Sequence, residues 1–77
     1  MEKTNYLTQL GIEIKKYRIA QQLSQEELAL KCEFDRTYIS LLERGKRNPS
    51  LFNLIRLCHG LEIQIHELLK EINWSRK

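Results

Sequence analysis

Apolar residues recur along this chain at the spacing of helices. Leu7, Leu10, Ile14 and Tyr17 follow one another at steps of three and four residues, so they share one face of a first helix. No stretch alternates between apolar and polar residues as a half-buried strand does. The pattern predicts an all-α domain with helices at about 7–21, 25–32, 36–44, 51–60 and 65–72, after polar residues 1–5 that we expect to fray.

Capping signals mark the helix ends between residues 24 and 48. Ser24 and Glu27 have the spacing of a capping box, Asp35 suits the N-cap of the next helix, and Gly45 is typical of the left-handed residue after a helix end. The interval between the second and third helices is too short for anything but a sharp angle. This stretch predicts a helix-turn-helix, which places its second helix in the major groove of DNA.

A single hydrophobic core is expected, because the 77 residues fit one domain spanning 1–77. The fourth helix should begin after Ser50, which is a good N-cap residue. The positions expected to face inward on the second, third and fourth helices are Leu28, Ala29, Cys32, Ile39, Leu42, Leu51, Leu54, Ile55, Leu57 and Cys58.

The composition is that of an ordinary globular protein. Apolar residues make up 42% and charged residues 30%, with 3 Gly and 1 Pro, which argues against disorder. No apolar run approaches the roughly 20 residues that span a bilayer. The first residues, MEKTNYLTQLGIEIKK, lack the apolar segment and cleavage site of a signal peptide. We therefore expect a cytoplasmic protein with no membrane partner.

Positive charge is concentrated in one part of the chain, although the net charge is only +3. Residues 36–56 hold five basic residues and one acid, a local charge of +4, so the rest of the chain has a net charge of −1. The five are Arg36, Arg44, Lys46, Arg47 and Arg56. The excess lies on and after the third helix, where a polyanion such as DNA would be met.

The cysteine and histidine residues do not have the pattern of a metal site. Cys32 and Cys58 each lie in an apolar helical pattern, which favours reduced core thiols over a disulfide. Zinc binding together with His59 and His66 is disfavoured, because no pair has the close spacing of structural zinc motifs. The sequence also lacks a phosphate-binding loop and a supported nucleophile with its base. We expect no enzyme, cofactor, metal or small-molecule ligand.

Four stretches of the sequence carry a family resemblance: LSQEELA, DRTYIS, LERGKRNPSL and the closing ELL. They are similar to the Cro/cI-type (Xre-like) helix-turn-helix repressors of bacteria and phages, and the match covers roughly residues 10–69. This resemblance implies a five-helix, lambda-repressor-like DNA-binding domain. DRTYIS followed by ERGKRNPS looks most like the small controller proteins of restriction-modification systems, which bind DNA as dimers. Gln22, Glu33 and Glu62 stand where many members have Gly, so a positive φ at these positions would be strained.

The resemblance implies that the first residues of the third helix face base edges. Arg36 can bond both acceptors of a guanine, with a phosphate contact or a solvated side chain as alternatives. Thr37 and Ser40 offer hydroxyl groups to a base edge or a phosphate. Leu41 stands where relatives often have a polar residue, so it either touches a thymine methyl group or packs against neighbouring helices.

A second group of residues is expected, by the same resemblance, to contact the DNA backbone and to supply affinity more than sequence information. Gln25 matches a family glutamine that contacts a phosphate and braces the third helix. The alternatives are core packing for Tyr38 and a minor-groove contact for Arg47. The expected backbone contacts are Gln25, Tyr38, Arg44, Lys46, Arg47 and Asn48.

Arg18 and Glu43 match a family ion pair between the first and third helices. We expect the pair to fix the recognition helix against the first helix. Removing one partner would leave an uncompensated charge in a partly buried place.

The end of the chain carries more apolar residues than packing on a small core requires. Ile63, Ile65, Leu69 and Trp74 are expected in a two-fold interface, with core packing as the alternative for Ile63. A homodimer would place two recognition helices about one DNA turn apart on a palindromic operator.

Double-stranded DNA and a second copy of the chain are thus the expected partners. RNA polymerase is a further one, through Glu26 and Glu27, although favourable placement at a helix start explains these acids equally well. The competing class is an antitoxin or adaptor that acts through a protein partner. DNA binding predicts an affinity that falls steeply with salt, whereas an apolar protein contact is far less sensitive.

Overall fold

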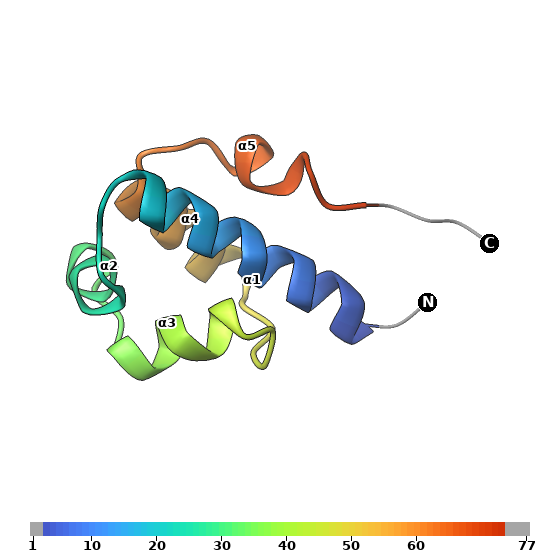
Figure 1. Ribbon diagram of the computed structural model, residues 1–77, viewed down its shortest axis with the longest axis horizontal. Helices are drawn as coiled ribbons and strands as arrows, with labels where there is room; N and C mark the ends of the chain where they lie inside the picture. Colours follow the sequence, from blue (N-terminus) through green and yellow to red (C-terminus); the bar gives the residue numbers. More distant parts are fainter. Residues whose placement is uncertain (1–2, 74–77) are drawn as a thin grey trace.

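The computed structural model describes residues 3–73, which form five helices: α1 (Lys3–Ala20), α2 (Gln25–Cys32), α3 (Arg36–Glu43), α4 (Leu51–Leu61) and α5 (Ile65–Leu69). No strand occurs in this range, so the expected all-α fold is confirmed. In Figure 1, α1 lies between α3 and α5, and it contacts both of them. α2 packs against α3 and α4. None of the described helices has the length and hydropathy needed to cross a membrane.

The helix bounds differ from the predicted ones at both ends of the chain. α1 begins at Lys3, so the expected fraying of residues 3–5 was wrong; no Gly or Pro interrupts the helix before Leu7. α5 ends at Leu69 and not at Ile72. The chain turns there: the backbone N–H of Ile72 donates to the carbonyl oxygen of Leu69 at 3.1 Å, and the backbone N–H of Asn73 donates to Gln9 Oε1 on α1 at 2.7 Å.

Side-chain caps begin α2 and α4 as the sequence predicts. Ser24 Oγ accepts from the backbone N–H of Glu27 at 3.0 Å, and the Glu27 carboxylate accepts from the backbone N–H of Ser24 at 2.7 Å. Ser50 Oγ accepts from the backbone N–H of Asn53 at 3.1 Å. Asp35 has the extended backbone of an N-cap, but its side chain makes no capping hydrogen bond to α3. The backbone carbonyl of Asp35, and not its carboxylate, accepts from the backbone N–H groups of Tyr38 and Ile39, at 3.0 and 3.3 Å.

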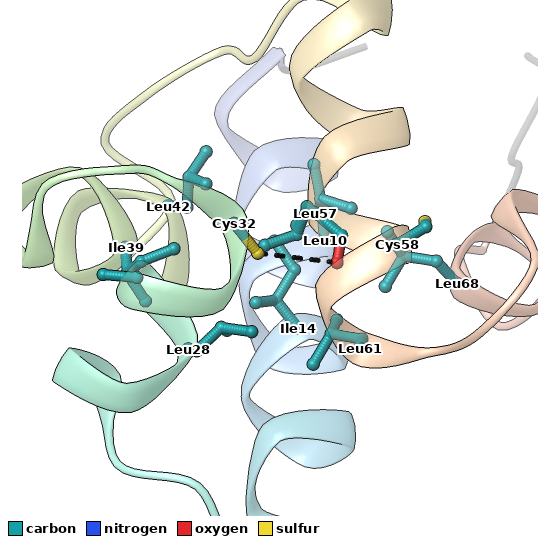
Figure 2. Close-up of a cluster of buried hydrophobic side chains, with 11 residues drawn as sticks. Leu10, Ile14, Leu28, Cys32, Ile39, Leu42, Leu57, Cys58, Leu61 and Leu68 are labelled. Atoms are coloured by element: carbon teal, nitrogen blue, oxygen red, sulfur yellow. Dashed lines mark hydrogen bonds between the residues drawn. The ribbon is translucent and has the colours of Figure 1, made fainter.

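The core lies where α1, α2, α3, α4 and α5 converge, and Figure 2 shows its side chains meeting between the helices. Ile14, Leu28 and Ile39 are fully buried, each on a different helix. Burying side chains of this size contributes about 1.5–3 kcal/mol each. The complete set is Leu10, Ile14, Leu28, Ala29, Cys32, Ile39, Leu42, Leu57, Cys58, Leu61 and Leu68.

Two residues of α4 that were expected in the core are exposed instead. The accessible fraction is 65% for Leu51 and 41% for Ile55. The prediction that these two side chains face the core was therefore wrong. Leu57 and Cys58 are buried as expected, and Leu54 is half-buried. The buried residues of α4 are Leu57, Cys58, Gly60 and Leu61, so the neighbouring helices cover only part of the apolar surface of this helix.

Positive backbone φ angles occur at the three positions where the family often has Gly. The angle is 60° at Gln22, 61° at Glu33 and 58° at Glu62. A non-glycine residue in this region costs on the order of 1 kcal/mol. The cost is partly offset at Glu33 and Glu62, whose backbone N–H groups donate to the last carbonyls of α2 and α4.

Gly11 allows α3 to lie directly against α1. A Cβ atom at this position would come within 2.5 Å of the carbonyl oxygens of Leu42 and Glu43. Any side chain at Gly11 would therefore push the end of α3 away from α1. This close approach sets the position of the helix that the sequence assigns to DNA recognition.

Both cysteines are free and buried, as expected for core thiols. Burial raises the pKa of Cys32 and of Cys58 above the usual value of a thiol. The Cys32 thiol donates to the carbonyl oxygen of Leu57 at 3.8 Å, which Figure 2 marks with a dashed line. The two residues contribute to packing between α2, α4 and α5.

Candidate nucleic-acid interface

Helix α3 has one buried and one exposed side. Ile39 and Leu42 are 0% and 2% accessible and face the core. Arg36 and Thr37, in the first turn, are exposed, and Ser40 is half-exposed one turn later. Three polar side chains thus project from the start of α3, as a recognition helix requires.

Leu41 lies beside this exposed face and is half-buried. It lines an open pocket of about 530 Å³ together with Thr37, Tyr38 and Arg47. This placement leaves part of its side chain packed against protein and part accessible. Both alternatives weighed for Leu41, a thymine contact and intramolecular packing, remain compatible with its position.

An ion pair anchors the far end of α3. Arg18 Nε lies 2.6 Å from Glu43 Oε2, and Arg18 Nη2 donates to Glu43 Oε1 at 3.0 Å, so the pair is bidentate. The side chains are only 11% and 3% accessible. The expected contact between Arg18 and Glu43 is therefore present in the structure, and it ties α1 to α3.

Two further bonds extend the ion pair into the turn and α2. Arg18 Nη1 donates to the carbonyl oxygen of Leu23 at 2.8 Å, and Gln25 Nε2 donates to Glu43 Oε1 at 3.1 Å. Gln25 thus braces α3 as the resemblance implies. An amide carries two N–H donors, so a second one is left for the expected phosphate contact.

The basic loop after α3, defined as Arg44, Lys46, Arg47 and Asn48, is exposed at each of these four residues. Gly45, inside the loop, has φ of 72°, and a Cβ atom there would come within 2.9 Å of Thr8 on α1. The loop is therefore held against α1 while its charged side chains face solvent. This arrangement gives the positive surface that a phosphate backbone attracts.

Tyr38 is half-buried and is held from several directions. Its ring centroid lies 4.8 Å from that of Phe34, and the guanidinium of Arg47 lies 5.6 Å from the Tyr38 ring centroid. Its hydroxyl accepts a hydrogen bond from Asn53 Nδ2 at 3.0 Å. The expected backbone contact and the alternative, packing, are thus both compatible with its position.

Arg56 has a structural role that the sequence reasoning missed. Although it belongs to the basic run, its Nη2 donates to the carbonyl oxygens of Cys32 and Glu33, at 2.8 and 2.6 Å. Its guanidinium also lies 4.2 Å from the ring centroid of Phe34. No local signal in the sequence points to this role, because these bonds depend on where α4 lies relative to the end of α2.

The family model described as Helix-turn-helix matches residues 14–68. The chain belongs to this helix-turn-helix family. The control protein C.MunI of a Mycoplasma species is 46% identical over 63 residues, covering 80% of this chain and 85% of that protein. The control protein C.BamHI of Bacillus amyloliquefaciens is 42% identical over 60 residues, covering 77% and 74%.

A solved helix-turn-helix structure has the same fold. The restriction-modification controller protein C.AhdI from Aeromonas hydrophila matches with a TM-score of 0.79 and 42% identity, covering 80% of this chain and 94% of that one. These similarities confirm the predicted family and fold. They also support the predicted role as a DNA-binding transcriptional regulator.

Proposed function

We propose that this protein regulates transcription by binding duplex DNA as a homodimer, with α3 of each copy in the major groove of one half of a palindromic operator. The observation that carries the proposal is the exposure of Arg36 and Thr37 at the start of α3, next to the exposed basic loop. The similarity to the restriction-modification controller protein C.AhdI favours a role in a restriction-modification system.

Within this proposal the residues have separate tasks. Arg36, Thr37 and Ser40, with Leu41 beside them, contact bases, and the basic loop contacts phosphates with Gln25 and Tyr38. The ion pair of Arg18 and Glu43 contacts no DNA but holds α3 at the angle that presents its first turn. A contact of Glu26 and Glu27 with RNA polymerase stays a prediction; both side chains are exposed.

The dimer surface that we propose combines α4 with Ile63, before α5, and Ile65, the first residue of α5. Ile55 on α4 lines a groove of about 140 Å³ together with Ile63 and Ile65, two of the residues expected in the interface. Leu51 and Phe52, at the start of α4, are 65% and 68% accessible. Such neighbouring exposed apolar side chains are typical of a surface that a protein partner covers.

Two other residues that were expected in the interface are not part of the proposed surface. Leu69 is half-buried and packs against the core, as Ile63 and Ile65 do, but it does not line the groove beside Ile55. Trp74 lies outside the described residues. The proposed surface therefore rests on Leu51, Phe52, Ile55, Ile63 and Ile65.

Replacing Ile55 by aspartate is expected to weaken dimerisation at least tenfold, because a carboxylate would be buried without a partner in the interface. Sedimentation velocity over a range of protein concentrations measures the change. Ile12→Asp is the matched control, since Ile12 on α1 is 52% accessible and Ile55 is 41% accessible. Equal dissociation constants for the two variants would contradict the proposed surface.

The proposed function is tested by selecting bound duplexes from a random-sequence pool with the full chain. We expect a site with two inverted halves, centred about one helical turn apart. Binding without sequence preference, or failure to retain any duplex at low salt, would contradict the proposal.

A further inference from the structure

A hydrogen bond joins α4 to a side chain of α3 that the proposed function assigns to the DNA backbone. Asn53, in the first turn of α4, donates from Nδ2 to the hydroxyl oxygen of Tyr38 on α3 at 3.0 Å. The backbone N–H of Asn53 donates to Ser50 Oγ at 3.1 Å, so the residue belongs to the capped start of its helix. Asn53 is half-buried and carries no charge.

The direction of this bond determines what the Tyr38 hydroxyl can still do. A phenol has one O–H donor and lone pairs that accept. Because Asn53 occupies a lone pair, the O–H proton is left to donate to another group. Within residues 3–73 the hydroxyl has no other hydrogen-bond partner. A phosphate oxygen, which only accepts, fits this remaining donor.

The aromatic ring of Tyr38 is also held, by contacts with Phe34 and Arg47. Phe34 packs against it with an angle of 52° between the rings, and the Arg47 guanidinium lies over it. Phe34 lies in the turn between α2 and α3, Arg47 lies in the basic loop, and Asn53 lies on α4. The hydroxyl is thus held in place before DNA arrives, and Arg47 adds positive charge beside it.

We propose that Asn53 is a positioning residue for DNA binding, which orients the Tyr38 hydroxyl as a hydrogen-bond donor to the DNA backbone. The inference rests on the proposed DNA-binding function and assigns Asn53 no contact with DNA itself. Asn53 acts only through Tyr38.

A double-mutant cycle tests this assignment, with the duplex selected by the wild-type chain as the probe. Tyr38→Phe is expected to weaken binding about tenfold, because it removes a donor to a charged acceptor. Asn53→Ala should weaken binding about threefold in the wild-type background, where the hydroxyl becomes free to rotate, and not at all in the Tyr38→Phe background. Asn5→Ala, an exposed change on α1, is the control and should have no effect.

Asn53→Asp is the second variant and tests the proposal even if Asn53→Ala fails to fold. Aspartate has nearly the same shape as asparagine. Its carboxylate accepts the phenol proton, so binding should become at least as weak as that of Tyr38→Phe. An equal loss from Asn53→Ala in both backgrounds would overturn the proposal, since Asn53 would then act independently of Tyr38. Wild-type protein that retains no duplex would overturn the DNA-binding function together with it.

Discussion

Replacing Glu43 by alanine is expected to lower the free energy of unfolding by about 3 kcal/mol. The change leaves the Arg18 guanidinium, which is 11% accessible in its side chain, without its bidentate partner. It also removes the acceptor of Gln25. A small domain has a total stability of only about 5–15 kcal/mol, so the loss would be a large part of it. Urea unfolding followed by circular dichroism measures the change.

Two comparisons separate the buried charge from other effects. The double variant Arg18→Met with Glu43→Leu should recover most of the lost stability, because apolar side chains of similar volume need no partner. Lys31→Ala breaks the exposed pair with Glu62 and should cost less than about 0.5 kcal/mol. A Glu43→Ala variant as stable as Lys31→Ala would show that the ion pair does not anchor α3.

Neutralising Arg44, Lys46 and Arg47 by glutamine is expected to weaken DNA binding on the order of 100-fold at low salt. Each of these exposed side chains is assigned to a phosphate, and each lost contact releases one counterion fewer. The slope of log affinity against log salt should therefore become shallower by about 0.9 per lost contact, or roughly three for each bound copy. Fluorescence anisotropy titrations at several salt concentrations measure both quantities.

A variant with the same loss of charge elsewhere provides the control. Lys15, Lys16 and Lys70 are exposed on α1 and after α5. Their replacement by glutamine should leave the salt slope nearly unchanged, because the charges lie outside the basic loop. Equal slopes for the two triple variants would mean that general charge attracts the DNA. A wild-type affinity that hardly changes with salt would favour the competing class, which acts through a protein partner.

The sequence predicted the parts of the fold that depend on local signals. The capping box of Ser24 and Glu27 is a short-range pattern, and Gly45 has the positive φ that its residue type favours. The contact of Arg18 with Glu43 spans 25 positions, and only the family resemblance pointed to it. The five helices follow from the helical spacing of apolar residues, whereas the exposed start of α3 was implied by the family resemblance.

Features that depend on how helices pack were not predictable from the pattern. Ile55 is as apolar as any core residue, and only the placement of α4 in the fold shows that its side chain is exposed. In the sequence Arg56 is one more positive charge, but in the fold its guanidinium donates to the carbonyl oxygens of Cys32 and Glu33 at the end of α2. The bond between Asn53 and Tyr38 joins two helices whose relative placement no local signal specifies.

The central claim, that the start of α3 reads the sequence of DNA, is tested most directly with Arg36→Ala. Affinities of this variant and of the wild-type chain are measured for the selected duplex and for every single base-pair change in it. We predict that discrimination falls at one position in each half-site, by about 1–3 kcal/mol, while preferences elsewhere persist. A uniform loss of affinity for all the duplexes, with every preference unchanged, would contradict the claim.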